Sequence, residues 1–156
     1  FRRKRETERD GDRFMGIRRR GRELALQILY HAEISGHATP DGLEFGLRHV
    51  GGSGKAKEFA RRLASGVTMH RAEIDRAIEE SSENWRLARI AKVDLIVLRV
   101  ATYELLYCPD IPLSVSIDEA LEVGKRYGSE DSRLFINRIL DHVAQAAGVK
   151  QVSKTV

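Results

Sequence analysis

The sequence predicts an all-α protein of six to seven helices, arranged as two small packed helical bundles. Apolar residues recur at helical spacing along most of the chain, and outside the short stretch 115–117 no alternating β-branched run occurs. The polar segment Ser81-Ser82-Glu83-Asn84 interrupts the helical pattern near the middle. With 156 residues, of which 42% are hydrophobic and 32% charged, the chain has the composition of a globular protein with one core.

The first half contains three predicted helices. The first begins at Arg18–Arg20 and ends at Ile34, before Ser35-Gly36. A short helix over 43–49 lies in a region rich in glycine, and a long helix covers 55–80. The apolar residues at helical spacing are Leu24, Ala25, Ile28, Leu29 and Ala32 in the first helix and Phe59, Leu63, Val67, Ile74 and Ile78 in the long one.

The segment 92–106 is the most apolar of the predicted helices. Its large aliphatic side chains cover most sides of the helix, which predicts a central and buried position. Pro109 and Pro112 follow it and end it, because proline cannot continue a helix.

Two further helices are predicted after these prolines. Ser116 and Glu119 form an S-x-x-E capping box, which predicts the start of a helix that ends at Tyr127-Gly128. The last helix is expected to begin near Ser129 or Ser132. It carries apolar residues at helical spacing up to Ala147, and Gly148 stops it.

Four regions are expected along the chain. Residues 1–16 form a disordered basic extension, 17–82 an N-terminal bundle, 83–150 a C-terminal bundle and 151–156 a flexible tail. Residues 1–22 hold ten Lys or Arg against four Asp or Glu, whereas the remainder holds 17 against 19. The positive excess therefore lies at the N-terminal end, which suggests a polyanionic partner.

The sequence carries no motif for catalysis or for a cofactor. Five histidines are scattered without the spacing of metal ligands, so no metal site is expected. Gly54-Lys55 resembles the end of a phosphate-binding loop, but Ala56 follows where serine or threonine is required. No apolar run is long enough to span a membrane. The single cysteine, Cys108, fits a reducing cytoplasm. We therefore expect a cytoplasmic protein that is not an enzyme.

The most informative segment is 17–30, IRRRGRELALQILY. Four arginines lie at the start of its amphipathic helix, namely Arg18, Arg19, Arg20 and Arg22. A guanidinium group presents paired donors to phosphates and a flat face to unstacked bases. The helix would hold the cluster in place, so an RNA-binding site is one interpretation. A solvated basic face is the alternative, because short runs of Lys and Arg have many roles.

Several segments together resemble the NusB family of transcription antitermination factors. They are RRRGRELALQILY at 18–30, SGVTMHRAEIDRAI at 65–78 and NWRLARIAKVDLIVLRVATYELLY at 84–107. The segment DIPLSVSIDEALEVGKRYGSEDSRLFINRILD follows at 110–141. Each motif alone is modest, but their order and spacing make the combined resemblance specific.

The resemblance implies an all-helical fold of two bundles without catalysis or cofactor. It implies binding of boxA-type single-stranded RNA together with a small-subunit ribosomal protein that acts as NusE. The complex would join RNA polymerase and suppress termination, especially in ribosomal RNA transcription. A homodimer that hides the arginines until RNA or the partner competes is a further hypothesis.

The resemblance also implies roles for individual residues. The four arginines match the arginine-rich RNA-binding motif, and Tyr30 matches an aromatic residue that could stack on a base. Asp131 and Phe135 match positions on the RNA-facing C-terminal helix. Structural roles compete with these. Tyr30 and Phe135 also fit apolar stripes, and Asp131 is placed to cap a helix.

Three other positions concern the partner surface and the family pattern. Asp94 matches an acidic position that meets the ribosomal protein, although it could instead be solvated or paired with Arg99. Trp85 is expected to pack between the two halves. Arg138 stands where the family commonly has glycine, so it could add a phosphate contact or fill space at the RNA surface.

Two other functions are compatible with the sequence. NusB-like domains also occur as accessory RNA-binding domains of RNA cytosine methyltransferases, which would require a longer protein than the one that ends soon after Gly148. A module that binds proteins through its helical surface alone is the third possibility. In that case the arginines would be a solvated tail.

Overall fold

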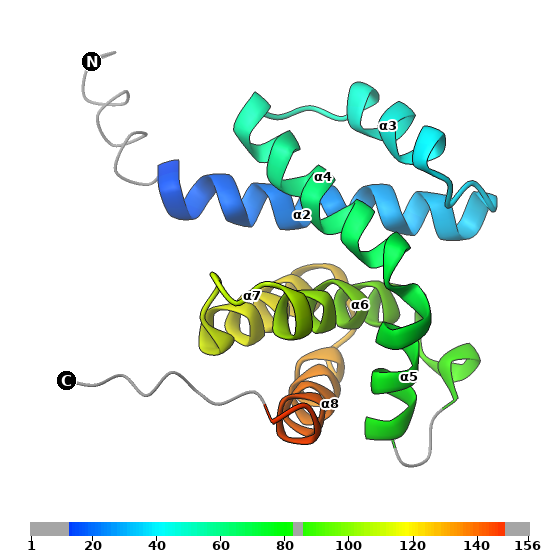
Figure 1. Ribbon diagram of the computed structural model, residues 1–156, viewed down its shortest axis with the longest axis vertical. Helices are drawn as coiled ribbons and strands as arrows, with labels where there is room; N and C mark the ends of the chain where they lie inside the picture. Colours follow the sequence, from blue (N-terminus) through cyan, green and yellow to red (C-terminus); the bar gives the residue numbers. More distant parts are fainter. Residues whose placement is uncertain (1–12, 83–85, 149–156) are drawn as a thin grey trace.

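The computed structural model describes residues 13–82 and 86–148 (Figure 1). These residues form seven α-helices and one short 3₁₀ helix, with no strand among them, so the predicted all-α class is confirmed. The helices are α2 (Arg13–Ser35), α3 (Pro40–His49), α4 (Gly54–Met69), α5 (Arg71–Ser81), α6 (Lys92–Tyr107), α7 (Leu113–Tyr127) and α8 (Ser132–Ala146), with the 3₁₀ helix η1 at Leu87–Arg89.

The helices form two packed bundles around one continuous core. Helices α2, α3 and α4 pack against one another, and α5, α6, α7 and α8 form the second group. Figure 1 shows α2 with α3 above it and α4 crossing it, while α6, α7 and α8 lie below. Helix α6 contacts both α2 and α4, and its apolar residues belong to the same buried cluster as theirs. It is therefore the central helix that its composition predicts.

The first helix begins earlier than expected. Helix α2 already includes residues 13–17, which the sequence had placed mainly in a disordered extension. Charge composition suggested disorder there, but apart from Gly16 these residues are compatible with a helix and continue it backwards from the arginines. The expectations for 1–12 and for the tail 151–156 lie outside the described residues.

The long helix predicted over 55–80 is two helices. His70 separates α4 from α5 with a non-helical backbone (φ −107°, ψ 21°). Helix α5 packs mainly against α6 and α8, so packing places the junction between the bundles at His70 rather than near residue 82. The seven-residue spacing between Val67 and Ile74 is that of a continuous helix, so the apolar pattern does not reveal this break. Trp85, expected between the halves, lies outside the described residues.

The prediction of a capping box at Ser116 is wrong. Helix α7 begins at Leu113, with Pro112 at the preceding position, so Ser116 lies inside the helix. Its buried hydroxyl donates to Glu104, and Glu119 binds Arg19. These tertiary partners outcompete the local capping interaction. Genuine side-chain caps are found elsewhere, where Thr39 opens α3 and Ser53 opens α4.

A close contact between α4 and α6 depends on Gly66. The ring of Tyr103 lies against the backbone of α4, where a Cβ atom added to Gly66 would be 2.0 Å from Cζ of Tyr103. No other residue fits there without movement of the ring or the helix. This contact joins the two bundles, because α4 belongs to one and α6 to the other.

Replacing Gly66 with alanine is expected to destabilise the fold by ~1–3 kcal/mol, because overpacking a filled site forces strain on its neighbours. Urea unfolding followed by circular dichroism measures this change. Gly54→Ala is the matched control on the same helix, since no atom lies within 4 Å of a Cβ added there. Equal stability of the two variants would contradict the close contact.

Candidate nucleic-acid interface

The four arginines of α2 divide into three exposed residues and one buried residue. The side chains of Arg18, Arg19 and Arg20 are 45%, 45% and 46% exposed. Arg22 is only 5% exposed. Arg22 stands three and four residues before Ala25 and Leu26, which are buried, so it occupies the inward face of the helix. The sequence analysis groups Arg22 with the other three because it considers charge and not position on the helix.

Arg22 forms a buried ion pair with Glu104 of α6. Its Nη2 donates to Oε1 of Glu104 at 2.7 Å, and its Nε donates to Oε2 at 3.1 Å. Ser116 of α7 donates to the same Oε1 at 3.0 Å. The guanidinium also lies 5.3 Å from the ring centre of Phe59 on α4. One buried group thus joins four helices, and its donors are not at the surface. Arg22 therefore holds the helices together, and the prediction that it contacts RNA is wrong.

Arg19 lines a groove between α2 and α7, and Arg20 pairs with Glu23, which also lines that groove. Nη2 and Nε of Arg19 donate to Glu119 at 3.0 and 3.2 Å, and this hydrogen-bonded pairing raises the pKa of Arg19. Arg20 donates to Glu23 at 3.3 Å, and Arg126 of α7 donates to the same carboxylate. The groove therefore alternates guanidinium and carboxylate groups.

Arg18 points toward α4 and the loop after α6. Its guanidinium lies 5.2 Å from the ring centre of Phe59, and its Nη2 is 3.9 Å from Asp110. Asp110 also accepts two hydrogen bonds from Arg62, at 2.6 and 3.0 Å. These bonds hold the pKa of Asp110 below its ordinary value.

The exposed arginines are therefore oriented before any ligand binds. Arg19 and Arg20 donate hydrogen bonds to carboxylates, and Nη2 of Arg18 lies 3.9 Å from Asp110, which limits the positions of the three planar groups. A phosphate has the same two-oxygen edge as a carboxylate and can replace it without a new arginine conformation. The arrangement can bind the backbone of a nucleic acid.

The other residues expected at the RNA surface lie elsewhere. Tyr30 is half-buried against the core, twelve residues along α2 from Arg18, which is ~18 Å along the axis. Asp131 is exposed at the start of α8 and makes no side-chain cap, contrary to its alternative role. Phe135 is half-buried against the core. Neither Tyr30 nor Phe135 belongs to the arginine cluster.

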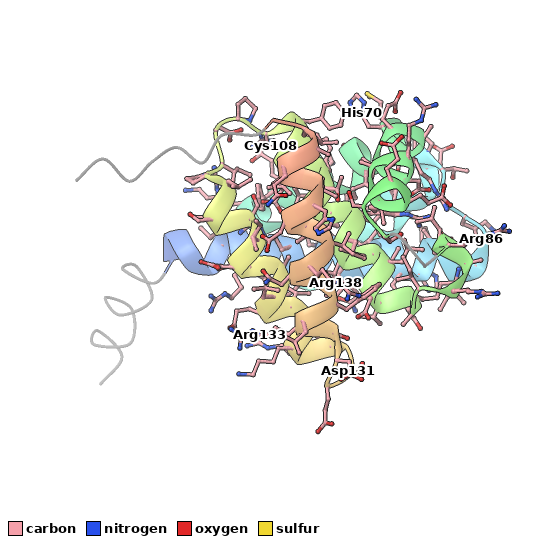
Figure 2. The ribbon with its side chains drawn as sticks, turned by 90° about the horizontal axis from the view of Figure 1, so that it is seen from below. His70, Arg86, Cys108, Asp131, Arg133 and Arg138 are labelled. Carbon is pink, nitrogen blue, oxygen red and sulfur yellow. The ribbon has the colours of Figure 1, made fainter. Side chains whose placement is uncertain are left out.

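Figure 2 shows how the polar residues of α8 lie. Asp131 and Arg133 are at the first turn of the helix, and Arg138 projects from its outer side. Arg138 is exposed, so its side chain extends into solvent and leaves the helix packing undisturbed. It does not fill a gap in the core at the position where the family commonly has glycine.

Asp94 is buried rather than displayed to a partner. It is 7% exposed and accepts a hydrogen bond of 2.7 Å from the hydroxyl of Ser132. This bond joins the start of α6 to the start of α8. Arg99, the expected alternative partner, binds Asp75 and Glu33 instead. The sequence could have suggested this, because Asp94 is surrounded by an apolar helix.

Other kinds of site are not found in 13–82 and 86–148. These residues contain no group of three His, Cys, Asp or Glu side chains that could hold a metal ion. None of their helices is both long and apolar enough to cross a bilayer.

Comparison with known proteins identifies close relatives. The model of the NusB family matches residues 19–145. Transcription antitermination protein NusB of Myxococcus xanthus (strain DK1622) is 49% identical over 136 residues, which are 85% of this chain and 97% of that protein. NusB of Geobacter sulfurreducens is 50% identical over 131 residues, covering 83% of this chain and 95% of that protein.

Solved structures show the same fold. NusB of T. maritima has a TM-score of 0.74 at 42% identity and covers 82% of this chain and 90% of its own. A complex of the antitermination factors NusB and NusE with double-stranded RNA contains a chain with a TM-score of 0.74 at 22% identity. That match covers 85% of this chain and 98% of the other. At this identity the second likeness concerns the fold alone.

Replacing Arg22 with methionine is expected to destabilise the protein by ~3–5 kcal/mol, because it leaves the Glu104 carboxylate buried without its cation. The double variant Arg22→Met/Glu104→Met should recover much of this loss. Arg20→Met, at an exposed pair, should change stability by less than ~1 kcal/mol. Urea unfolding compares the three. An Arg22→Met variant as stable as the parent would contradict a buried ion pair.

Proposed function

This chain belongs to the NusB family of non-enzymatic, RNA-binding transcription antitermination proteins, and we propose that it binds boxA-type single-stranded RNA together with a small-subunit ribosomal protein that acts as NusE. The observation that carries this proposal is the set of exposed, pre-oriented arginines Arg18, Arg19 and Arg20. The RNA-bound complex would act with RNA polymerase to suppress termination, especially in ribosomal RNA transcription.

Binding to RNA is an exchange of anions at fixed cations. A backbone phosphate takes the place of Glu119 at Arg19 and of Glu23 at Arg20, while Glu23 keeps its bond to Arg126. Because the arginines are already ordered, little side-chain entropy is lost in this step. The carboxylates also make weak, non-specific phosphate contacts less favourable, because every phosphate must compete with an existing ion pair.

Base recognition is assigned to the aromatic residues that the resemblance implies. Tyr30 and Phe135 are half-buried, so each can offer one ring face or edge to an unstacked base. Asp131, exposed at the start of α8, can accept hydrogen bonds from base amino groups. Arg22 has a structural role and leaves the set of direct contacts.

Asp94 supports the proposed partner surface from within. Its hydrogen bond to Ser132 fixes the starts of α6 and α8 relative to each other. The ribosomal protein would contact exposed residues around these helix starts. A NusB–NusE pairing is described for the relative whose structure contains both proteins. A homodimer that covers the arginines remains a prediction for sedimentation at increasing protein concentration.

The relatives favour antitermination over the two alternative functions. The matched Myxococcus and Geobacter proteins carry the antitermination name, and the alignment covers 97% and 95% of their lengths. The match is therefore to whole antitermination proteins rather than to one domain of a methyltransferase. The exposed arginines at the start of α2 also favour RNA binding over a module that binds only proteins.

The chain is expected to bind a boxA-like single strand more tightly than a scrambled strand of the same composition. Adding the ribosomal partner should increase this preference. The factor by which the partner raises the affinity for RNA should equal the factor by which RNA raises the affinity between the two proteins. Three phosphate contacts predict a slope of log affinity on log salt of about −2, at ~0.7 per phosphate. Fluorescence anisotropy at several salt concentrations measures both quantities. Equal binding of the two strands, with and without the partner, would contradict the proposal.

A further inference from the structure

Basic and aromatic side chains continue from Arg18 along the boundary between α4 and α6. We call this surface the α4–α6 edge, and its members are Arg62, His70, Tyr103 and Tyr107. Arg62 and Arg18 share the carboxylate of Asp110, so the edge is directly connected to the arginine cluster of α2. Figure 2 places His70 on the opposite side of the molecule from Asp131 and Arg133 at the start of α8. The edge is therefore distinct from the α8 surface.

Three rings of the α4–α6 edge, those of His70, Tyr103 and Tyr107, have centres within 6.2 Å of one another and nearly parallel planes, and we call them the ring stack. The ring centres of His70 and Tyr107 are 4.0 Å apart with an angle of 16° between their planes. Those of Tyr103 and Tyr107 are 5.6 Å apart with an angle of 26°. Each ring is half-buried, so the stack is fixed by the fold and still reaches the surface. Gly66 allows Tyr103 to lie flat against α4, which holds the stack in place.

The α4–α6 edge carries positively charged side chains that are partly exposed to solvent. Arg62 is 38% exposed and holds Asp110 with both of its terminal nitrogens. Arg18 lies on the other side of the same carboxylate, so two cations share one anion. A phosphate placed here would meet two oriented guanidinium groups.

We propose that the α4–α6 edge is a second binding segment for single-stranded RNA, which takes nucleotides that flank the strand bound at the α2 arginines. Arg62 binds a backbone phosphate, and an unstacked base extends the ring stack at Tyr107 and His70. A basic track with aromatic stacking positions is the usual design for binding single strands with little sequence preference. The proposal rests on the RNA binding proposed above and adds a place and a length to it.

The dimensions of α4 set that length. Phe59, beneath Arg18, and His70 are eleven residues apart, which corresponds to ~16 Å along the helix. At the ~3.4 Å spacing of stacked nucleotides the edge would take at most about five nucleotides, and fewer where bases are unstacked. A minimal boxA-like strand would leave it empty, and a strand with about six additional nucleotides on the correct side would fill it.

The test compares a short boxA-like RNA with two longer strands that carry six extra adenosines at the 5′ or the 3′ end. The full chain is used, and the readout is the ratio of the Kd for the short strand to the Kd for each long strand. One extension should tighten binding about tenfold in the parent protein. Tyr107→Leu and Arg62→Gln should reduce this gain to about twofold or less, and Tyr107→Phe should retain it, because the ring rather than the hydroxyl stacks.

The chain offers matched controls for both variants. Arg61 is adjacent to Arg62 and also binds a carboxylate with two nitrogens, but that carboxylate is Glu44 of α3. Phe45 stacks on His49 with ring centres 4.1 Å apart, on α3 and outside the edge. Arg61→Gln and Phe45→Leu should therefore keep the full gain. Thermal unfolding confirms that each variant is folded.

The outcomes separate this proposal from the proposed function. If the parent binds the short strand but gains nothing from either extension, the second segment is contradicted and boxA binding stands. A gain that survives both Tyr107→Leu and Arg62→Gln also overturns it. Variants that weaken only the binding of the ribosomal protein would show that the edge is a protein-binding surface instead. If the short strand does not bind at all, the proposed function itself fails.

Discussion

The buried ion pair between Arg22 and Glu104 is the interaction on which the candidate site depends. It joins α2 to α6 and, through Ser116, to α7, where the two bundles meet. A buried charge pair of this kind adds little net stability compared with apolar packing, but removing one partner is costly. Its main consequence is geometric. It fixes the rotation of α2, and this directs Arg18 toward α4 and Arg19 toward α7.

Arginines nearer the surface are also oriented by carboxylates. Arg19, Arg20 and Arg62 are partly exposed, and each is held by a carboxylate from its own helix, from α7 or from the loop after α6. Solvent screens these pairs, so they contribute little to stability. They do limit the positions of the guanidinium groups, and they give an incoming phosphate a defined place to bind. The protein thus uses acidic residues to order a basic surface.

The sequence predicts the helical class well because apolar spacing directly reports which face of a helix is buried. It could not predict that α4 and α5 are separate, since the spacing on either side of His70 is equally helical and only the packing partner changes. The capping box failed for a related reason, because Ser116 and Glu119 are bound by residues distant in the sequence. Local patterns do not contain such partners.

The arginine motif was located correctly on α2, but its members were not distinguished. Charge counting treats Arg22 like Arg19, whereas helical position places Arg22 beside buried residues. Asp94 shows the same pattern, as an acid on an apolar helix that is bound internally by Ser132. A charged residue within an apolar stripe thus indicates a buried, paired side chain. This signal in the sequence could have predicted the burial of Arg22 and Asp94. The ring stack of the α4–α6 edge could not have been found, because it depends on the turn at His70.

The account holds that Arg18, Arg19 and Arg20 bind RNA from positions fixed by the fold. The most direct test replaces these three with glutamine and measures boxA-like RNA binding against salt. A triple replacement of Lys55, Lys57 and Arg61 on α4 removes the same charge elsewhere. The account predicts that the first variant loses most of its affinity and that its salt slope rises from about −2 toward zero, while the second retains both. Unchanged affinity and slope in a folded first variant would contradict it.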